Sequence, residues 1–159
     1  MLTNNTVVNG WHLYQYPLFA EQLTSLKNDV KNLKKNDPEH YQSHPKTKLL
    51  ASIFKAINKT VPDNPEHPDF RQGNTLGKDN RHWRRVKKGI PNRYRLFFRF
   101  NSTPPAIIYV WINDEHTLRK EGAKTDCYTV FKKKLKRGEI PDSIESLIAE
   151  TERENNSKI

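Results

Sequence analysis

Basic side chains that could stabilise negative charge gather in one stretch of the chain, residues 81–100. This stretch contains no acidic residue and eight cations: Arg81, Arg84, Arg85, Lys87, Lys88, Arg93, Arg95 and Arg99. In its second half the basic residues alternate with Tyr94, Leu96, Phe98 and Phe100. Period-two alternation predicts a strand with one face in a core and the other presenting guanidinium groups. Because like charges on one face repel, we expect a polyanion to bind there.

Fixed cations of this kind suit the cleavage of RNA without a metal. RNA carries its own nucleophile, the 2′-hydroxyl, so an enzyme must orient it, remove its proton and stabilise a phosphorane of increased negative charge. The candidate catalytic residues are Arg85, Lys87 and Arg95, joined after the next strand by Arg119, Lys124 and Tyr128. Lysine among other cations can act as a base, and tyrosine can act as a base or as a stacking platform. A surface that only grips phosphates would need the same residue types, so catalysis and simple binding both stay open.

Two other groups of residues were weighed as metal ligands. His40 and His44 stand four apart, but Pro45 interrupts the segment and no third ligand follows at a suitable spacing, so we interpret them as surface histidines. Residues 113–116 (NDEH) could hold Mg²⁺ for phosphodiester cleavage. A two-metal nuclease needs carboxylates from several elements, which this basic region lacks. The sequence predicts no metal and no other cofactor, and a metal-dependent nuclease is the less favoured alternative.

The distribution of charge supports a nucleic-acid-binding surface. The 159 residues carry a net charge of +10, and most of the excess lies in residues 81–137, with 16 basic and 4 acidic side chains. Cys127 is the only cysteine, so no intrachain disulfide can form. The first ten residues (MLTNNTVVNG) do not have the pattern of a signal peptide, and no apolar run approaches a membrane span. We therefore expect a cytoplasmic protein with no membrane contact.

Hydrophobic periodicity predicts the elements that position these residues. An amphipathic helix should begin at Pro17 and end before Pro38, and a second should span residues 45–59. A short strand or hairpin is expected within residues 7–16, and strands are expected over residues 83–88, 93–100 and 106–112, the last of them central and covered on both faces. A helix capped by Thr125 or Asp126 and a last helix after Pro141 complete the chain. This order predicts one α+β domain over residues 1–159, with helices packed on one face of a small antiparallel sheet. Residues 1–6 and 152–159 are expected to fray.

Long ordered blocks of the sequence resemble the YhaV family of bacterial type II toxins, within the RelE-like superfamily. The blocks are VNGWHLY near the start, KTKLLA at 46–51, FRQGNTLG at 70–77, WRRVKKG at 83–89, RYRLFFRF at 93–100 and WINDEHTLRKEGAKTDCYTVFKKKLKRG at 111–138. The resemblance implies a RelE-like fold and an mRNA interferase, an endoribonuclease that cleaves translated mRNA without a metal and in a ribosome-dependent way. It also implies inhibition by a PrlF-type antitoxin of the AbrB-like class, with operator DNA bound only through the toxin–antitoxin complex.

The same resemblance implies roles for individual residues. It matches Arg85 and Lys87 to the superfamily's basic pair before the turn, and Arg95 to the arginine of its tyrosine-arginine strand. Either Arg119 or Lys124 matches the late cation, followed by Tyr128. The remaining cations are expected to contact the RNA backbone: Arg81, Arg84, Lys88, Arg93, Arg99, His116 and Lys132. A non-catalytic module that binds RNA or the ribosome and inhibits translation stays as an alternative.

Overall fold

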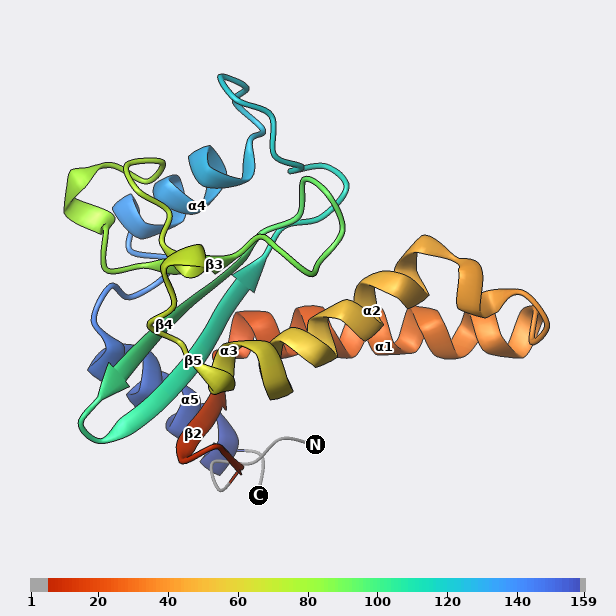
Figure 1. Cartoon of the computed structure of the whole chain (residues 1–159), viewed down its shortest axis with the longest axis horizontal. Helices are drawn as coiled ribbons and strands as arrows, with labels where there is room; N and C mark the ends of the chain where they lie inside the picture. The colour runs from red at the N-terminus through yellow and green to blue at the C-terminus, as the bar shows by residue number, and fades with distance from the viewer. Residues whose placement is uncertain (1–5, 158–159) are drawn as a thin grey trace.

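One five-stranded sheet lies at the centre of the chain in the computed structural model, which describes residues 6–157 (Figure 1). The strands are β1 (Val7–Val8), β2 (Trp11–Gln15), β3 (Arg84–Val86), β4 (Leu96–Ser102) and β5 (Pro105–Ile112). Their order across the sheet is β1-β2-β5-β4-β3, so β5 is central as predicted. Of the residues predicted to fray, residues 1–5 and 158–159 lie outside the described part of the chain. Elsewhere in residues 152–159 the last helix continues to Ser157.

The sheet is mixed. β5 pairs antiparallel with β4, and β4 with β3, which is the meander that the sequence predicts. On its other side β5 pairs in parallel with β2, from His12 opposite Ala106 to Gln15 opposite Tyr109. The α+β class is confirmed, whereas the expectation of a wholly antiparallel sheet holds for three of the four strand pairings. Period-two patterns identify a strand but not its neighbour, so the parallel pairing was not visible in the sequence.

Helices make up most of the rest of the described chain. They are α1 (Pro17–Asn36), α2 (Pro45–Lys55), α3 (Val61–Asp63), α4 (Cys127–Lys136) and α5 (Ile144–Ser157). A π-helical turn, η2 (Ala56–Thr60), continues α2, and short 3₁₀ turns occur at η1 (Tyr41–Ser43), η3 (Pro68–Phe70) and η4 (Lys78–Asn80). The predicted starts of α1 at Pro17 and of α2 at Pro45 are confirmed. Proline suits the first turn of a helix because it lacks an N–H, which this turn would leave unpaired.

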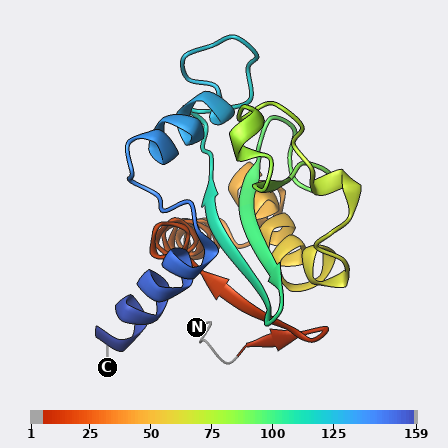
Figure 2. The same cartoon turned by 90° about the vertical axis from the view of Figure 1, so that its left-hand side faces the viewer.

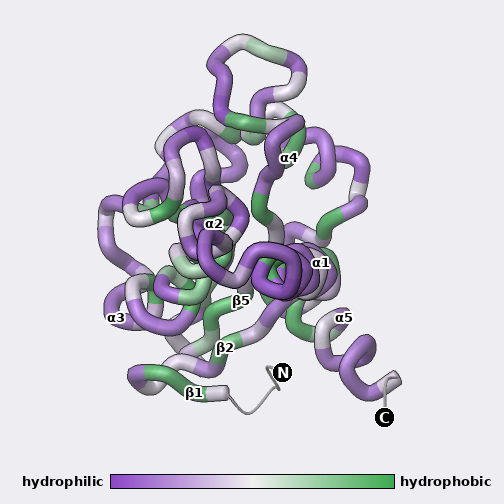
Figure 3. The backbone as a smooth tube through the Cα atoms, turned by 90° about the vertical axis from the view of Figure 1, so that its right-hand side faces the viewer, coloured by the Kyte–Doolittle hydropathy of each residue, from purple (hydrophilic) through white to green (hydrophobic). Residues whose placement is uncertain are grey.

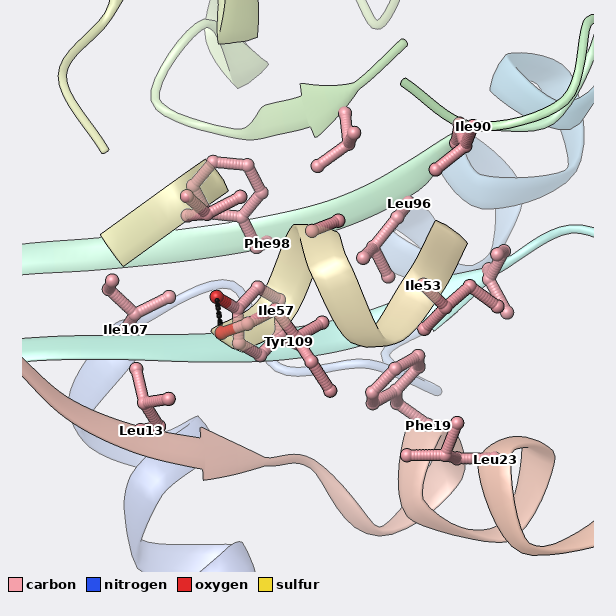
Figure 4. Packing of buried hydrophobic residues seen from close by; sticks show 14 of the residues in the cluster. Leu13, Phe19, Leu23, Ile53, Ile57, Ile90, Leu96, Phe98, Ile107 and Tyr109 are labelled. Atoms are coloured by element: carbon pink, nitrogen blue, oxygen red, sulfur yellow. Dashed lines mark hydrogen bonds between the residues drawn. The ribbon is translucent and has the colours of Figure 1, made fainter. Parts of the chain in front are cut away.

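Two hydrophobic clusters cover the two faces of the sheet. Leu96, Phe98, Ile107 and Tyr109 pack with α1 and α2 on one face, where the Tyr109 hydroxyl donates to the Ile57 carbonyl at 2.9 Å (Figure 4). Phe97, Ile108 and Val110 pack with α4 and α5 on the other. In Figure 2, α2 lies on one side of β4 and β5, and α4 and α5 lie on the other. The prediction that helices cover only one face is therefore wrong, because Phe97 and the apolar run of β5 require apolar partners on both faces.

The chain enters β4 later than its alternation suggested. Arg93 has a left-handed φ of 72°, and the backbone N–H of Arg95 donates to the Asn113 side chain rather than to a neighbouring strand. β4 therefore begins at Leu96. The side chains still alternate, so that Tyr94, Leu96 and Phe98 belong to the first cluster while Arg95 and Phe97 point to the α4 side.

The hairpin of α1 and α2 projects from the sheet, and its tip is mostly hydrophilic (Figures 1 and 3). Phe19 and Leu23 near the base of α1 are buried, whereas the residues from Lys34 to His40 are exposed. Within residues 6–157 no helix has the length and hydropathy needed to cross a membrane.

Candidate active site around Tyr128

Three arginines from three parts of the chain converge on Tyr128 in the first turn of α4. The Tyr128 hydroxyl oxygen accepts a hydrogen bond from Arg85 Nε at 2.9 Å and from Arg95 Nε at 3.2 Å. The Arg119 guanidinium lies over the Tyr128 ring, 4.8 Å from its centroid, in a cation–π contact. The tyrosine is therefore held at its hydroxyl and on its face by positive charges. Four of the six predicted catalytic residues come together here.

Packing between α4 and β4 fixes where the tyrosine stands. Phe97, which is opposite Arg85 in the pairing of β3 with β4, stacks on Phe131 of α4 with ring centroids 4.3 Å apart. The same Phe97 ring meets Tyr128 edge to face, with a centroid distance of 5.5 Å. Offset and edge-on aromatic pairs hold defined geometries in a core. The Phe97 face of β4 thus brings the start of α4 over β3, within reach of Arg85.

Arg95 is buried beneath the tyrosine. Its residue is 6% exposed, and its Nη1 donates to the Tyr94 carbonyl at 2.8 Å in addition to the Tyr128 bond. Arg85 is half-buried, and its Nη1 donates to the Asp69 carbonyl at 2.6 Å. A buried guanidinium must be hydrogen-bonded to offset its desolvation, and these acceptors supply that requirement. Because Arg85 and Arg119 are only half-buried, a ligand can reach them more easily than it can reach Arg95.

Asp126 is the buried carboxylate that organises this site. At 2% exposure it accepts from Arg119 Nη1 at 3.0 Å, from the Lys120 N–H at 2.7 Å and from the Tyr128 N–H at 3.2 Å. Burial alone would lower the pKa of Arg119, but the hydrogen bond and charge of Asp126 outweigh it, so the pKa is raised. The hydrogen bond from the Tyr128 N–H makes Asp126 the N-cap of α4. Asp126 is one of the two residues predicted for this cap. One side chain thereby holds both Arg119 and Tyr128.

A second buried polar residue, Asn113, ties the connection after β5 to the start of β4. Its Oδ1 accepts from the Arg95 N–H at 2.7 Å, and its Nδ2 donates to the carbonyls of Arg93 at 3.0 Å and Thr117 at 2.8 Å. Arg93 also binds the backbone of Arg119: the Arg119 N–H donates to the Arg93 carbonyl at 2.8 Å, and Arg93 Nε donates to the Arg119 carbonyl at 3.0 Å. These bonds place Arg119 beside the strand that carries Arg95.

The other predicted catalytic residues, Lys87 and Lys124, lie outside this cluster. Both side chains are exposed, and neither hydrogen-bonds to Tyr128. Lys87 directly follows β3, and Lys124 lies in the connection before α4. Of the two candidates for the cation that precedes Tyr128, it is Arg119 rather than Lys124 that contacts the tyrosine.

The residues predicted to contact RNA are spread more widely. Arg81, Lys88, Arg93, His116 and Lys132 are exposed. Lys88 pairs with Asp69 at 3.1 Å, and Arg81 Nε donates to Asn74 at 2.8 Å.

Arg84 and Arg99 are half-buried and are held by other parts of the protein. Arg84 stands over Phe100, and Arg99 stands over Trp83 and donates to the Asp142 carbonyl. Burial lowers the pKa of both guanidinium groups. Arg84 is paired with Phe98 across the sheet, whereas Arg85 is paired with Phe97, so the two neighbouring arginines lie on opposite faces.

The 113–116 segment, weighed as a metal site, forms a turn. Asp114 Oδ1 accepts from the His116 N–H at 2.9 Å and from Thr117 Oγ1 at 3.0 Å. Within the part of the chain that the structure describes, no three His, Cys, Asp or Glu side chains are grouped so that they could hold a metal ion. His44 is the N-cap residue of α2, where its Nδ1 accepts from the Lys46 N–H at 3.1 Å.

Sequence reasoning missed two of the residues that build the site. The sequence indicates Asp126 only as a possible helix cap and Asn113 only as a possible metal ligand. An Asp at a cap position seven residues after an Arg is a weak signal, since the contact depends on how the intervening loop folds. The link that Asn113 makes to the start of β4 has no local signal, because the partners there, Arg95 and Arg93, are 18 and 20 residues earlier in the chain.

Arginine guanidinium groups gathered in this way have the charge and the N–H donors that suit phosphate groups, which makes the cluster a candidate site for them. Residues 13–152 match the family of YhaV toxins, described as toxins with endonuclease activity of a toxin–antitoxin system. The chain is 51% identical over 146 residues to the Toxin YhaV of Escherichia coli O6:H1 and to the Ribonuclease toxin YhaV of Escherichia coli K12, covering 91% of this chain and 94% of each relative. No solved structure matches the chain.

The chain therefore belongs to the YhaV family of toxins with endonuclease activity. The resemblance read from the sequence blocks is confirmed. A toxin of a toxin–antitoxin system has an antitoxin as its partner.

Proposed function

We propose that the protein is an mRNA interferase, an endoribonuclease that cuts translated mRNA on the ribosome without a metal and uses the RNA 2′-hydroxyl as nucleophile. The observation that carries this proposal is the convergence of Arg85, Arg95 and Arg119 on Tyr128. Cleavage by the 2′-hydroxyl needs stabilised charge and two proton transfers, which such side chains can provide. The name of the K12 relative, a ribonuclease toxin, supports RNA as the substrate.

In this mechanism the 2′-oxygen attacks the phosphorus and the bond from phosphorus to the 5′-oxygen breaks. A base takes the proton of the 2′-hydroxyl, and the departing 5′-oxygen receives a proton. The products are a 2′,3′-cyclic phosphate and a 5′-hydroxyl. Arg85 and Arg119 stabilise the phosphorane oxygens, while the buried Arg95 holds the tyrosine and adds its charge from below.

Tyr128 contacts the reacting groups directly in this proposal. Because its oxygen accepts two N–H groups, its own proton is available to an oxygen of the scissile phosphate or to the departing 5′-oxygen. Lys87, two residues after Arg85, and Lys124, four residues before Tyr128, are exposed and can reach a bound substrate to move protons. The exposed cations Arg81, Lys88, Arg93, His116 and Lys132 contact the RNA backbone. Arg84 and Arg99, whose Nη1 atoms donate to the carbonyls of Arg81 and Asp142, attract the RNA by their charge.

The partners and location follow from the same reading. The antitoxin is of the PrlF type, with an AbrB-like fold, and the toxin–antitoxin complex reaches operator DNA through the antitoxin. Ribosomes and mRNA place the toxin in the cytoplasm. The charge of the chain, +10, suits a surface that approaches ribosomal RNA.

The test is induction of the wild type, Arg119→Ala and Tyr128→Phe in cells, followed by mapping of mRNA 5′ ends. Lys136→Ala, an exposed change on α4 with the same loss of charge, is the matched control for Arg119→Ala. New in-frame cuts should occur with the wild type and the control only, since loss of one charge-stabilising donor typically costs about 10²–10³ in rate. Growth arrest with intact mRNA would support a non-catalytic translation inhibitor instead.

Independence from metal is tested separately with purified toxin. Asp126, the buried carboxylate of the site, supports cleavage without a metal, because it already accepts three hydrogen bonds from the protein. Cleavage of translated mRNA should be undiminished in excess EDTA when ribosomal Mg²⁺ is held constant by a matched buffer. If EDTA abolishes the cleavage of ribosome-free RNA and added Mg²⁺ or Mn²⁺ restores that cleavage, the result would favour a metal-dependent nuclease.

A further inference from the structure

A groove with an apolar floor lies between the base of the helical hairpin and the end of β5. It has a volume of about 740 Å³ and is lined by parts of α1, α2, the turn before β4 and residues 112–115. The floor is formed by Leu23, Leu26, Leu49, Ile53 and Tyr94. Leu23 and Ile53 are buried, whereas Leu26, Leu49 and Tyr94 are partly exposed to the groove. An apolar floor of this size on an otherwise strongly polar chain marks an interaction surface.

The rim of the groove is acidic, in contrast to the rest of this basic protein. Glu21, Asp29, Asp114 and Glu115 line it, together with Lys46 and His44. Lys46 is neutralised by its pair with Asp29 at 3.0 Å. Glu21 and Asp114 form no ion pair with a residue of the described part of the chain, and Glu115 has a 3.7 Å contact with the exposed His116 and lies near enough to Lys46 for its charge to raise the pKa of that lysine.

Charge decides what kind of partner fits. RNA phosphates would be repelled by the rim carboxylates, so the groove is not an extension of the RNA surface. A peptide segment with apolar side chains for the floor and lysine or arginine for the rim is complementary in both respects. The Tyr94 phenol, whose pKa is raised by burial and by Glu115 and Asp114, stays neutral and can donate a hydrogen bond to such a segment.

The groove and the Tyr128 site share a wall. Tyr94 has its side chain in the groove, and its carbonyl accepts from the guanidinium of Arg95 in the site. Asn113 also lines the groove and binds the backbone of Arg93 and Arg95. A partner seated on Tyr94 and Asn113 therefore touches the residues that hold the site together.

We propose that this groove binds the antitoxin, through a segment whose apolar side chains cover the floor and whose basic side chains pair with Glu21, Asp114 and Glu115. The inference rests on membership of a toxin–antitoxin family and on the groove itself, and not on the chemistry proposed for the Tyr128 site.

The test compares two charge reversals that change the net charge equally. Glu21→Lys combined with Glu115→Lys alters the rim, and Glu39→Lys combined with Glu121→Lys alters exposed glutamates away from the groove. The probe is the antitoxin of this toxin's own toxin–antitoxin system, purified alone and titrated into each toxin by calorimetry. We expect the rim variant to bind on the order of tenfold or more weakly, with less than about a twofold effect for the control. Equal affinities for the two variants, or no binding to the wild type, would overturn the proposal.

Hydrogen exchange of the wild-type complex gives a second readout that needs no variant. The antitoxin should slow exchange at residues 21–29, 46–53 and 112–115, and protection confined to β3 and α4 would contradict a groove-bound segment. Sedimentation of the toxin alone covers the case of a second copy in the groove: self-association that the rim variant abolishes would refute the antitoxin as occupant. RNA cleavage by the free rim variant, compared with the wild type, reports separately on the proposed function.

Discussion

Replacement of Asp126 by alanine probes the contact on which the geometry of the site depends. The substitution leaves the N–H groups of Lys120 and Tyr128 without their acceptor and the Arg119 guanidinium without its anion. Loss of a helix cap costs about 1 kcal/mol. Removal of one partner from a buried ion pair costs about 3–5 kcal/mol. Because the Arg119 side chain keeps 25% exposure and can rehydrate, we expect the lower part of that range.

The expected loss for Asp126→Ala is thus about 3–4 kcal/mol in the free energy of unfolding, measured by urea denaturation with an unchanged m-value. Asp126→Asn keeps one carbonyl acceptor for the cap and loses the charge, so about 1–2 kcal/mol is expected. In a double-mutant cycle the loss caused by Asp126→Ala should fall to about 1 kcal/mol when Arg119 is already alanine. If the two substitutions are additive, Asp126 stabilises only the start of α4 and the argument that it positions Arg119 is refuted.

Three further predictions concern single side chains. Tyr128→Phe removes the acceptor of the buried Arg95 Nε and should abolish RNA cleavage while lowering the free energy of unfolding by about 1–3 kcal/mol; full cleavage activity would remove the hydroxyl from the mechanism. Burial and the neighbouring Asp126 raise the pKa of the Cys127 thiol to about 11, so iodoacetamide at pH 8 should alkylate it only after denaturation, as mass spectrometry can check. Burial raises the pKa of Asp142, but hydrogen bonds from His82 and Trp83 lower it more, so its net pKa lies below 3.8. The stability it adds is present above the ordinary carboxyl pKa of 3.8 and is lost as pH falls through the lowered pKa, so Asp142→Asn should destabilise less at low pH than at pH 7; equal effects at both would contradict this.

Patterns that are local in the sequence predicted the elements well. The apolar run of residues 106–112 identified the central strand, and the leucine spacing after Pro17 identified α1. The alternation before Phe100 placed Arg95 on the other face of the strand from Tyr94, Leu96 and Phe98. This is the face on which Arg95 meets Tyr128. These features depend on neighbouring residues, so a single sequence contains them.

Features that depend on distant residues were not predictable in the same way. The covering of both sheet faces follows from Phe97 meeting Phe131, and the loop position of Arg119 follows from Asn113 and Arg93. Lys124, which looked equivalent to Arg119 by type and spacing, lies away from the tyrosine because the buried carboxylate selects Arg119. Side-chain hydrogen bonds across loops leave no periodicity, so they need coordinates.

The parallel pairing of β2 with β5 has a consequence for how the toxin is made. His12 lies beside Ala106, so the sheet closes only after about a hundred residues separate the two partners on the growing chain. Tyr128, on which the arginines converge, is synthesised later still. Pairings so distant in sequence form slowly, because the loop entropy is lost before the contacts are gained. A nascent chain therefore has no assembled Tyr128 cluster until residue 128 has left the ribosome, so the cleavage proposed for that cluster cannot begin before then.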